Sequence, residues 1–101
     1  MTDAELVADF MRLTEVDGKT VLEVGVVEWA GPYEPELVWK RFRRWTTWPT
    51  AERLAVAQRK ALETVRFFRI CSICNERQNA GHMMDRETCQ SCAEKHLGVV
   101  F

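Results

Sequence analysis

The stretch from Cys71 to Gly98, CSICNERQNAGHMMDRETCQSCAEKHLG, holds all four cysteines of this 101-residue chain. They form two pairs, Cys71-x2-Cys74 and Cys89-x2-Cys92, with fourteen residues between the pairs. A tight turn brings two thiolates with this spacing to the same side of a metal ion, and two such pairs fill the tetrahedral shell of zinc. Two disulfides or four free thiols are the alternatives, but the acidic first residues do not resemble a secretory signal. The sequence therefore predicts one Zn²⁺ site with these four cysteines as ligands.

The residues beside each pair predict how that pair is presented. Asn75 follows the first pair and is one of the few non-glycine residues that accept the left-handed conformation a zinc knuckle needs. The run from Ala93 to Gly98 after the second pair favours a helix that ends on glycine. One knuckle and one helix-borne pair resemble the treble-clef class of zinc fingers over residues 71–98. The resemblance implies nucleic-acid binding, protein interaction or, with added histidines, nuclease chemistry, and so no single function.

Catalysis is not expected from the residue pattern. Four thiolates already complete a zinc shell, so His82 is expected at the surface or near the cluster, and His96 on the metal-facing side of the short helix. Neither histidine belongs to a known catalytic signature, and no nucleophile elbow, phosphate-binding glycine loop or metalloprotease helix is present. We therefore expect a non-catalytic protein.

Size and composition predict one small unit that the metal helps to stabilise. The chain is 47 % apolar and 29 % charged, which favours a packed core over disorder. We expect a helix-strand-helix-helix region over residues 1–70 and a zinc-binding module over 71–101, packed as one unit. No apolar run is long enough to cross a bilayer, so no membrane partner and a cytoplasmic location are expected.

The N-terminal third predicts a helix and then a strand. Asp3 is expected to cap an amphipathic helix that carries Leu6, Val7, Phe10 and Met11 on one face. A turn at Asp17-Gly18 precedes a valine-rich strand over residues 20–29. This strand needs a partner, which could be residues 12–16 across the turn, the zinc module or another chain.

The middle of the chain predicts two helices and, with the strand, an α+β fold. Residues 35–46 place Val38 and Phe42 at helical spacing, with Pro35 in the first turn. The opposite face of this helix is purely basic, and its candidate nucleic-acid-binding residues are Lys40, Arg43 and Arg44. Thr50 is expected to cap a third helix over residues 51–69.

Charge is divided along the chain although the net charge is −1. Residues 1–36 hold nine acidic and two basic residues, whereas residues 37–70 hold nine basic and two acidic ones. The basic block, with Trp39, Phe42, Trp45 and Trp48 among its arginines, favours a nucleic-acid partner. The alternatives are that the acidic block folds against the basic one and that the tryptophans are core residues.

The chain end adds a second functional hypothesis. Val99, Val100 and Phe101 are apolar and are expected to be partly buried by strand pairing within the chain or in a homodimer. The first hypothesis is a zinc-binding regulatory protein associated with nucleic acid through the basic helix. The second is a protein-interaction or assembly module that uses apolar surface and the C-terminal strand, with zinc only as a structural element.

Overall fold

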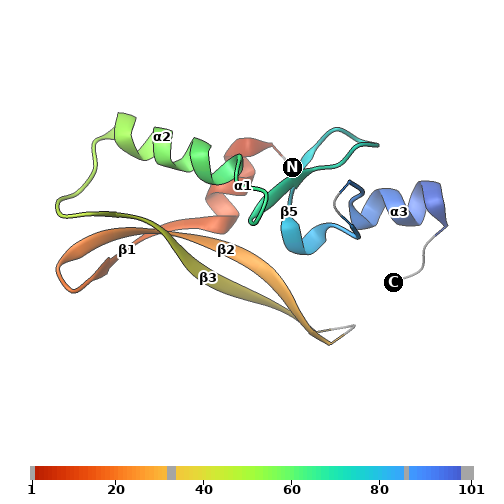
Figure 1. Ribbon diagram of the computed structural model, residues 1–101, viewed down its shortest axis with the longest axis horizontal. Coiled ribbons are helices and arrows are strands. Elements are labelled where there is room, and N and C mark those ends of the chain that lie inside the picture. Colours follow the sequence, from red (N-terminus) through yellow and green to blue (C-terminus); the bar gives the residue numbers. More distant parts are fainter. Residues whose placement is uncertain (1, 32–33, 86, 99–101) are drawn as a thin grey trace.

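The computed structural model describes residues 2–31, 34–85 and 87–98, with only the backbone for residues 96 and 97. An antiparallel sheet in the order β1-β2-β3 is formed by β1 (Met11–Val16), β2 (Lys19–Gly31) and β3 (Glu34–Trp45). Helices α1 (Asp3–Phe10) and α2 (Ala51–Leu62) lie over the same face of this sheet (Figure 1). The chain thus combines helices with antiparallel strands, consistent with the predicted α+β class.

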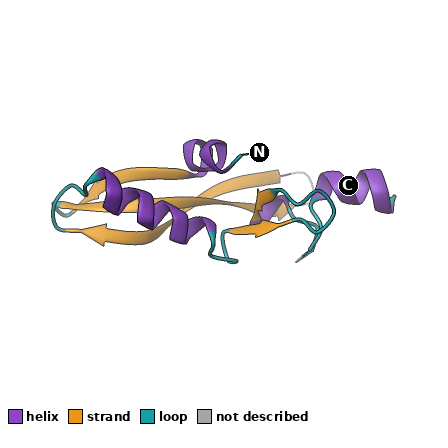
Figure 2. Cartoon of the chain, turned by 90° about the horizontal axis from the view of Figure 1, so that it is seen from above, coloured by secondary structure: helices purple, strands orange, loops and turns teal. Residues whose placement is uncertain are grey.

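The C-terminal part is built from short elements at one end of the long sheet (Figure 2). Strands β4 (Phe68–Ile70) and β5 (Arg77–Asn79) form a second, two-stranded antiparallel sheet. A 3-10 turn, η1 (Ala80–His82), and helix α3 (Gln90–Leu97) follow. Because β4 precedes Cys71 and pairs with β5 after it, the segment before the cysteines and the segment between them are hydrogen-bonded to each other.

Helix α1 is capped by Thr2, and the predicted cap at Asp3 is wrong. The Thr2 hydroxyl accepts a hydrogen bond from the Glu5 amide at 3.2 Å, and the Glu5 carboxylate accepts one from the Thr2 amide at 3.1 Å. This reciprocal capping box satisfies free amides that Asp3 alone would not reach. Leu6 and Phe10 are buried on the predicted face, but Met11 already belongs to β1.

The valine-rich strand pairs with two strands of its own chain. A two-residue turn joins β1 to β2, and both turn residues have positive φ, 51° at Asp17 and 75° at Gly18. These angles match the twist of an antiparallel hairpin, and glycine adopts them without steric cost. Of the three partners that the sequence left open, residues 12–16 across the turn are confirmed, and β3 is an additional partner on the other edge.

The predicted helix over residues 35–46 is wrong, because this segment is strand β3. Its apolar residues are valine, tryptophan and phenylalanine, which suit a half-buried sheet as well as a helix. The long strand β2 has a second edge whose backbone groups need partners, and β3 supplies them from Glu34 to Trp45. The register shifts where Arg41 and Arg43 oppose neighbouring residues of β2, which leaves Phe42 as the extra residue of a bulge. Phe42 and Trp45 both pack against the core from this strand, so their spacing does not reflect a helix.

Helix α2 begins as predicted but ends earlier than the predicted residue 69. The Thr50 hydroxyl accepts a hydrogen bond from the Arg53 amide at 3.2 Å, which confirms the cap. The helix ends at Leu62, and a turn follows in which the carbonyl of Thr64 accepts from the amides of both Phe67 and Phe68. These two neighbouring aromatic residues are both buried, which the turn allows and a continuous helix with one buried face would not. The main core cluster comprises Leu6, Phe10, Met11, Leu22, Val24, Val26, Ala57, Ala61, Leu62, Phe67 and Phe68.

Asn79 attaches the C-terminal part to the large sheet just beyond the first residue of β1. Its buried side chain donates to the carbonyl of Gly25 at 2.9 Å and accepts from the amide of Val27 at 3.1 Å. The pairing of β1 with β2 stops at Val24, so the Asn79 amide group continues the hydrogen bonding that a longer β1 would provide. Trp29 adds a further bond, from its indole Nε1 to the carbonyl of Gly81 at 2.8 Å.

Replacing Asn79 with aspartate is expected to destabilise the protein by about 1–3 kcal/mol. A carboxylate can still accept from Val27, but it cannot donate to the Gly25 carbonyl and would face that oxygen in a buried position. Urea unfolding followed by tryptophan fluorescence measures the change. The control is Gln78→Glu, the same chemical change at the neighbouring half-buried position. An equal loss in both variants would contradict the role given to Asn79.

Candidate metal centre

The first cysteine pair lies on a tight turn directly after β4. The amide of Asn75 donates to the carbonyl of Cys71 at 2.8 Å, and Asn75 itself has a φ of 58°. This positive φ is the left-handed conformation that the sequence predicted for Asn75, and asparagine tolerates it better than most residues. The turn directs the backbone back towards β5, so that Cys71 and Cys74 present their sulfurs on one side.

The second pair lies at the start of α3. Cys89 is the N-cap residue of this helix and Cys92 is in its first turn, so both lie where backbone amides are free of helical partners. Gly98 ends the helix with a φ of 68°, as predicted from the sequence. An isolated antiparallel bridge between Met83 and Cys89 closes a short hairpin that leads into the helix.

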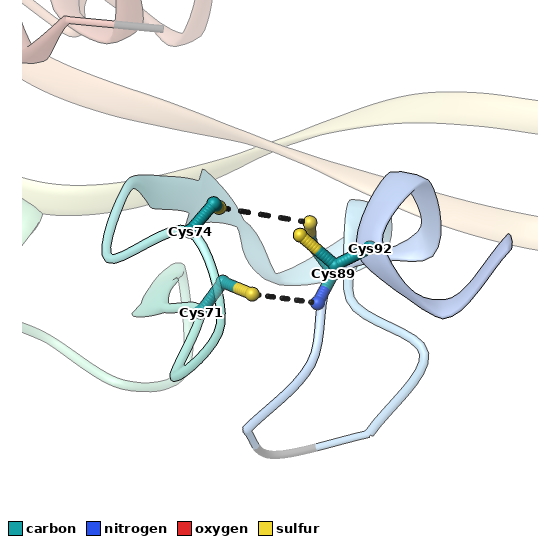
Figure 3. A group of neighbouring side chains, drawn as sticks. All are labelled: Cys71, Cys74, Cys89 and Cys92. Atoms are coloured by element: carbon teal, nitrogen blue, oxygen red, sulfur yellow. Dashed lines mark hydrogen bonds between the residues drawn. The ribbon is translucent and has the colours of Figure 1, made fainter. Parts of the chain in front are cut away.

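The four sulfur atoms converge in one cluster (Figure 3). Their ligand atoms all lie within 4.8 Å of one another, and the sulfurs of Cys74 and Cys89 are 4.0 Å apart. Tetrahedral zinc with bonds of about 2.3 Å to sulfur needs sulfur–sulfur separations of about 3.8 Å. The arrangement therefore fits a zinc ion with small adjustments, and the residues present could hold a metal ion. Three of the cysteines are buried and Cys74 is exposed.

The surroundings of the cluster lower the pKa of the Cys71 thiol and raise that of Cys92. Burial raises the pKa of the Cys71 thiol, but the amides of Cys74, Cys89 and Ile73 outweigh burial and bring that pKa to about 6. One of these bonds, from the Cys89 amide to the Cys71 sulfur, is 3.4 Å long. Burial and the neighbouring thiols raise the pKa of Cys92 to about 12. The backbone amides thus favour the thiolate of Cys71, whereas four thiolates this close together require a cation.

Of the two histidines, only His82 has a described side chain, and it is not among the residues that converge in the cluster. His82 is half-buried, and its ring packs edge-on against Phe10 with centroids 6.0 Å apart. Burial in this apolar contact lowers the pKa of His82. His96 lies on α3, but its side chain is outside the described part of the chain, so the expectation for it stays a prediction.

The predicted basic residues do not share one helical face. Lys40 forms an ion pair with Glu28 across β2 and β3, at 3.0 Å. Arg43 and Arg44 are neighbours on a strand, so their side chains leave opposite faces of the sheet. The pairing of Lys40 with Glu28 is one local case in which the acidic block folds against the basic one.

A different basic cluster surrounds a surface hollow between the β1–β2 turn and the end of β3. Its charged lining residues are Lys19, Arg41, Arg43, Arg44 and, as the one acidic group, Asp17. Sequence reasoning missed Lys19, because only the hairpin pairing brings it beside the arginines of β3. Among the described residues, the structure gives no ion-pair partner to Lys19, Arg41, Arg43 or Arg44.

The tryptophans interleaved with these arginines have different environments. Trp48 is 69 % exposed, whereas Trp45 packs against the main core. Trp39 is half-buried, and the guanidinium of Arg12 lies 4.1 Å from its ring centroid. The set therefore does not form one continuous stacking surface, and the expectation that these tryptophans are core residues holds for Trp45 alone.

Comparisons with known proteins identify no relative: no family model, no curated protein and no solved structure matches this chain. No helix in the described part of the chain has the length and apolar character needed to cross a membrane. Val99, Val100 and Phe101, for which strand pairing was predicted, lie outside the described residues. The division of the chain at residue 70 also stays a prediction.

Proposed function

We propose that Cys71, Cys74, Cys89 and Cys92 bind one Zn²⁺ ion as thiolates in a treble-clef-like module. The convergence of the four sulfurs within 4.8 Å supports this proposal, together with a knuckle at one pair and a helix start at the other. Four thiolate ligands suit zinc better than calcium or magnesium, which prefer oxygen ligands.

The zinc ion has a structural role in this proposal, and the protein is not an enzyme. Four protein ligands fill the tetrahedral shell, so no position is left for a substrate or an activated water molecule. The module is also hydrogen-bonded to the large sheet through Asn79, so metal binding stabilises a surface that extends beyond the cysteines. The protein acts by binding a partner, in a regulatory role.

The partner in the favoured version of this function is nucleic acid, bound at the basic hollow rather than on a basic helix. The observation that carries it is the set of Lys19, Arg41 and Arg44, which share one face of the sheet, with Asp17 as the one acidic residue lining the same hollow. Guanidinium groups bind phosphate oxygens in a forked geometry, and the cluster has the charge that a phosphate backbone requires. Trp48, exposed just after β3, is available to stack on an unpaired base.

Reversing two charges on the same face of the hollow, with Arg41→Glu and Arg44→Glu together, is expected to weaken nucleic-acid binding at least about tenfold. Fluorescence anisotropy with labelled single-stranded RNA and double-stranded DNA measures the affinity. Wild-type binding should weaken steeply between about 50 and 200 mM salt, because each phosphate contact releases counterions.

The matched control reverses two exposed arginines outside the hollow, Arg59→Glu and Arg66→Glu. These variants have the same change in net charge, so an equal effect would show general charge dependence and not a site. Binding that does not respond to salt, or no retention of either nucleic acid at low salt, would contradict the proposal.

A second candidate function is assembly with another protein chain. The observation that favours it is the outer edge of β3, the last strand in the order β1-β2-β3, which has no partner strand among the described residues. Unpaired strand edges bind further strands through backbone hydrogen bonds.

A further inference from the structure

The free edge of β3 has a defined set of outward-facing backbone groups. Asn79 bonds to the Gly25 carbonyl and the Val27 amide on the side of β2 that faces β1. In an antiparallel sheet these groups alternate from one edge to the other along a strand. The alternate residues of β2 therefore bond to β3. Val24 pairs with Lys40, Val26 with Val38 and Glu28 with Glu36. It follows that the amide and carbonyl groups of Leu37 and Trp39 face the free edge.

Both ends of this free edge are closed to further pairing. Pro35 has no amide hydrogen to donate, and it lies at an outward-facing position of β3, where edge strands tolerate proline. The bulge at Phe42 bends the strand at the other end. Between these two features lies a short regular segment, residues 36–41, that could pair with one more strand.

The side chains of this segment are held in place by their own sheet. A Cβ atom at Gly25 would lie 2.9 Å from a methyl carbon of Leu37 and 3.3 Å from the ring of Trp39, so both side chains lean over the glycine. The Arg12 guanidinium covers the Trp39 ring on the same face. Leu37 nevertheless remains 42 % exposed. The edge thus presents ordered apolar side chains that a further strand would cover at little cost in conformational entropy.

The sequence of β3 is complementary to itself when one copy is reversed. Glu34 and Glu36 lie in its first half, the apolar run Leu37-Val38-Trp39 is central, and the bases follow. Antiparallel pairing of two identical strands places the acidic half of each opposite the basic half of the other. Such pairing has two-fold symmetry, which closes the assembly at two chains.

Only one register satisfies both the backbone and the side chains. When Val38 pairs with Val38 of a second copy, Leu37 of one copy lies opposite Trp39 of the other. These two residues can then exchange both backbone hydrogen bonds. Each Glu36 then lies opposite a Lys40, and aromatic–aliphatic and opposite-charge pairs are favourable cross-strand neighbours. The next register that suits the backbone, centred on Trp39, would place Leu37 opposite Arg41 and is less favourable.

We propose that two copies of this chain pair through the β3 edge in this register and form a continuous six-stranded antiparallel sheet. The inference rests on the assembly function and names its partner as a second copy of the chain. It does not depend on zinc or on nucleic acid.

Charge reversal at the pairing residues tests the proposal by sedimentation velocity over a range of protein concentrations. The wild-type chain is expected to show a monomer–dimer equilibrium. Glu36→Lys and Lys40→Glu should each weaken the dimer by about tenfold, because the symmetry places two like-charge pairs in each homodimer. Mixing the two variants should restore the dimer, since positions 36 and 40 then have opposite charges in both of their pairs across the dimer interface. Glu15→Lys, on the other outer strand β1, is the matched control and should leave the dimer unchanged.

Three results would overturn the pairing and can be told apart. A wild-type chain that stays monomeric removes both the pairing and the assembly function as argued from this edge. A dimer that persists in both single variants shows association through another surface, so the β3 pairing fails while assembly stands. A mixture that does not dimerise although each variant alone is monomeric and folded by circular dichroism excludes the proposed register.

Discussion

Replacing Cys74 with serine is expected to release the zinc ion and unfold residues 71–98. Cys74 is the exposed member of the cluster, so its loss removes little buried surface, and the effect reports on metal binding. In so small a module, binding and folding are one equilibrium, and structural zinc contributes on the order of 10 kcal/mol in isolated fingers. Elemental analysis should find about one zinc per wild-type chain and much less in the variant. Circular dichroism should show that a chelator has the same effect on the wild type.

His82→Ala is the control for this experiment. The histidine ring packs on Phe10, so its removal should lower stability modestly while zinc content stays the same. Equal loss of zinc in both variants would indicate a histidine ligand. Purified protein without metal, or with two disulfides by mass spectrometry, would contradict the zinc centre itself.

Replacing Gly81 with alanine should have the second-largest effect, because it would separate the C-terminal part from the large sheet. The added methyl carbon would lie 2.5 Å from the Val27 Cβ atom and closer still to the Val27 carbonyl oxygen. The carbonyl belongs to the backbone in the middle of β2, so it cannot move without disturbing the sheet. We expect the free energy of unfolding to fall by about 3 kcal/mol or more. The hydrogen bond from Trp29 to the Gly81 carbonyl should also be lost.

Gly31→Ala is the matched control for Gly81→Ala. Among the described residues, a methyl carbon there would meet nothing nearer than the Glu34 carboxylate, at 3.9 Å, so stability should hardly change. Thermal unfolding of both variants, with hydrogen exchange at residues 77–82, measures the difference. A stable Gly81→Ala protein with unchanged exchange would contradict the close approach of η1 to β2.

The candidate metal centre could be predicted from the sequence because its determinants are local. Two cysteines separated by two residues meet at one turn whatever surrounds them, and Asn75 tolerates the conformation that this turn needs. The helix after the second pair and its end at Gly98 depend on neighbouring residues alone. The hairpin at Asp17-Gly18 is local in the same sense. The α1 cap was placed one residue late because Asp3 is also a good cap, and only the position of Glu5 favours Thr2.

Strand β3 could not be predicted in this way, since its apolar residues fit a helix and a strand equally well. The second edge of β2 decided between them, because its backbone groups need hydrogen-bond partners. The sequence of residues 34–45 does not show that this edge exists. Because this segment is a strand and not a helix, Lys40 forms an ion pair with Glu28, and Lys19 lies beside the arginines of β3. The role of Asn79 is equally non-local, because its partners on β2 lie more than fifty residues earlier in the chain. The sequence by itself thus determined where the four cysteines meet, through short-range backbone geometry. Only the tertiary structure decided which surfaces surround them, because buried backbone groups must find hydrogen-bond partners wherever the fold provides them.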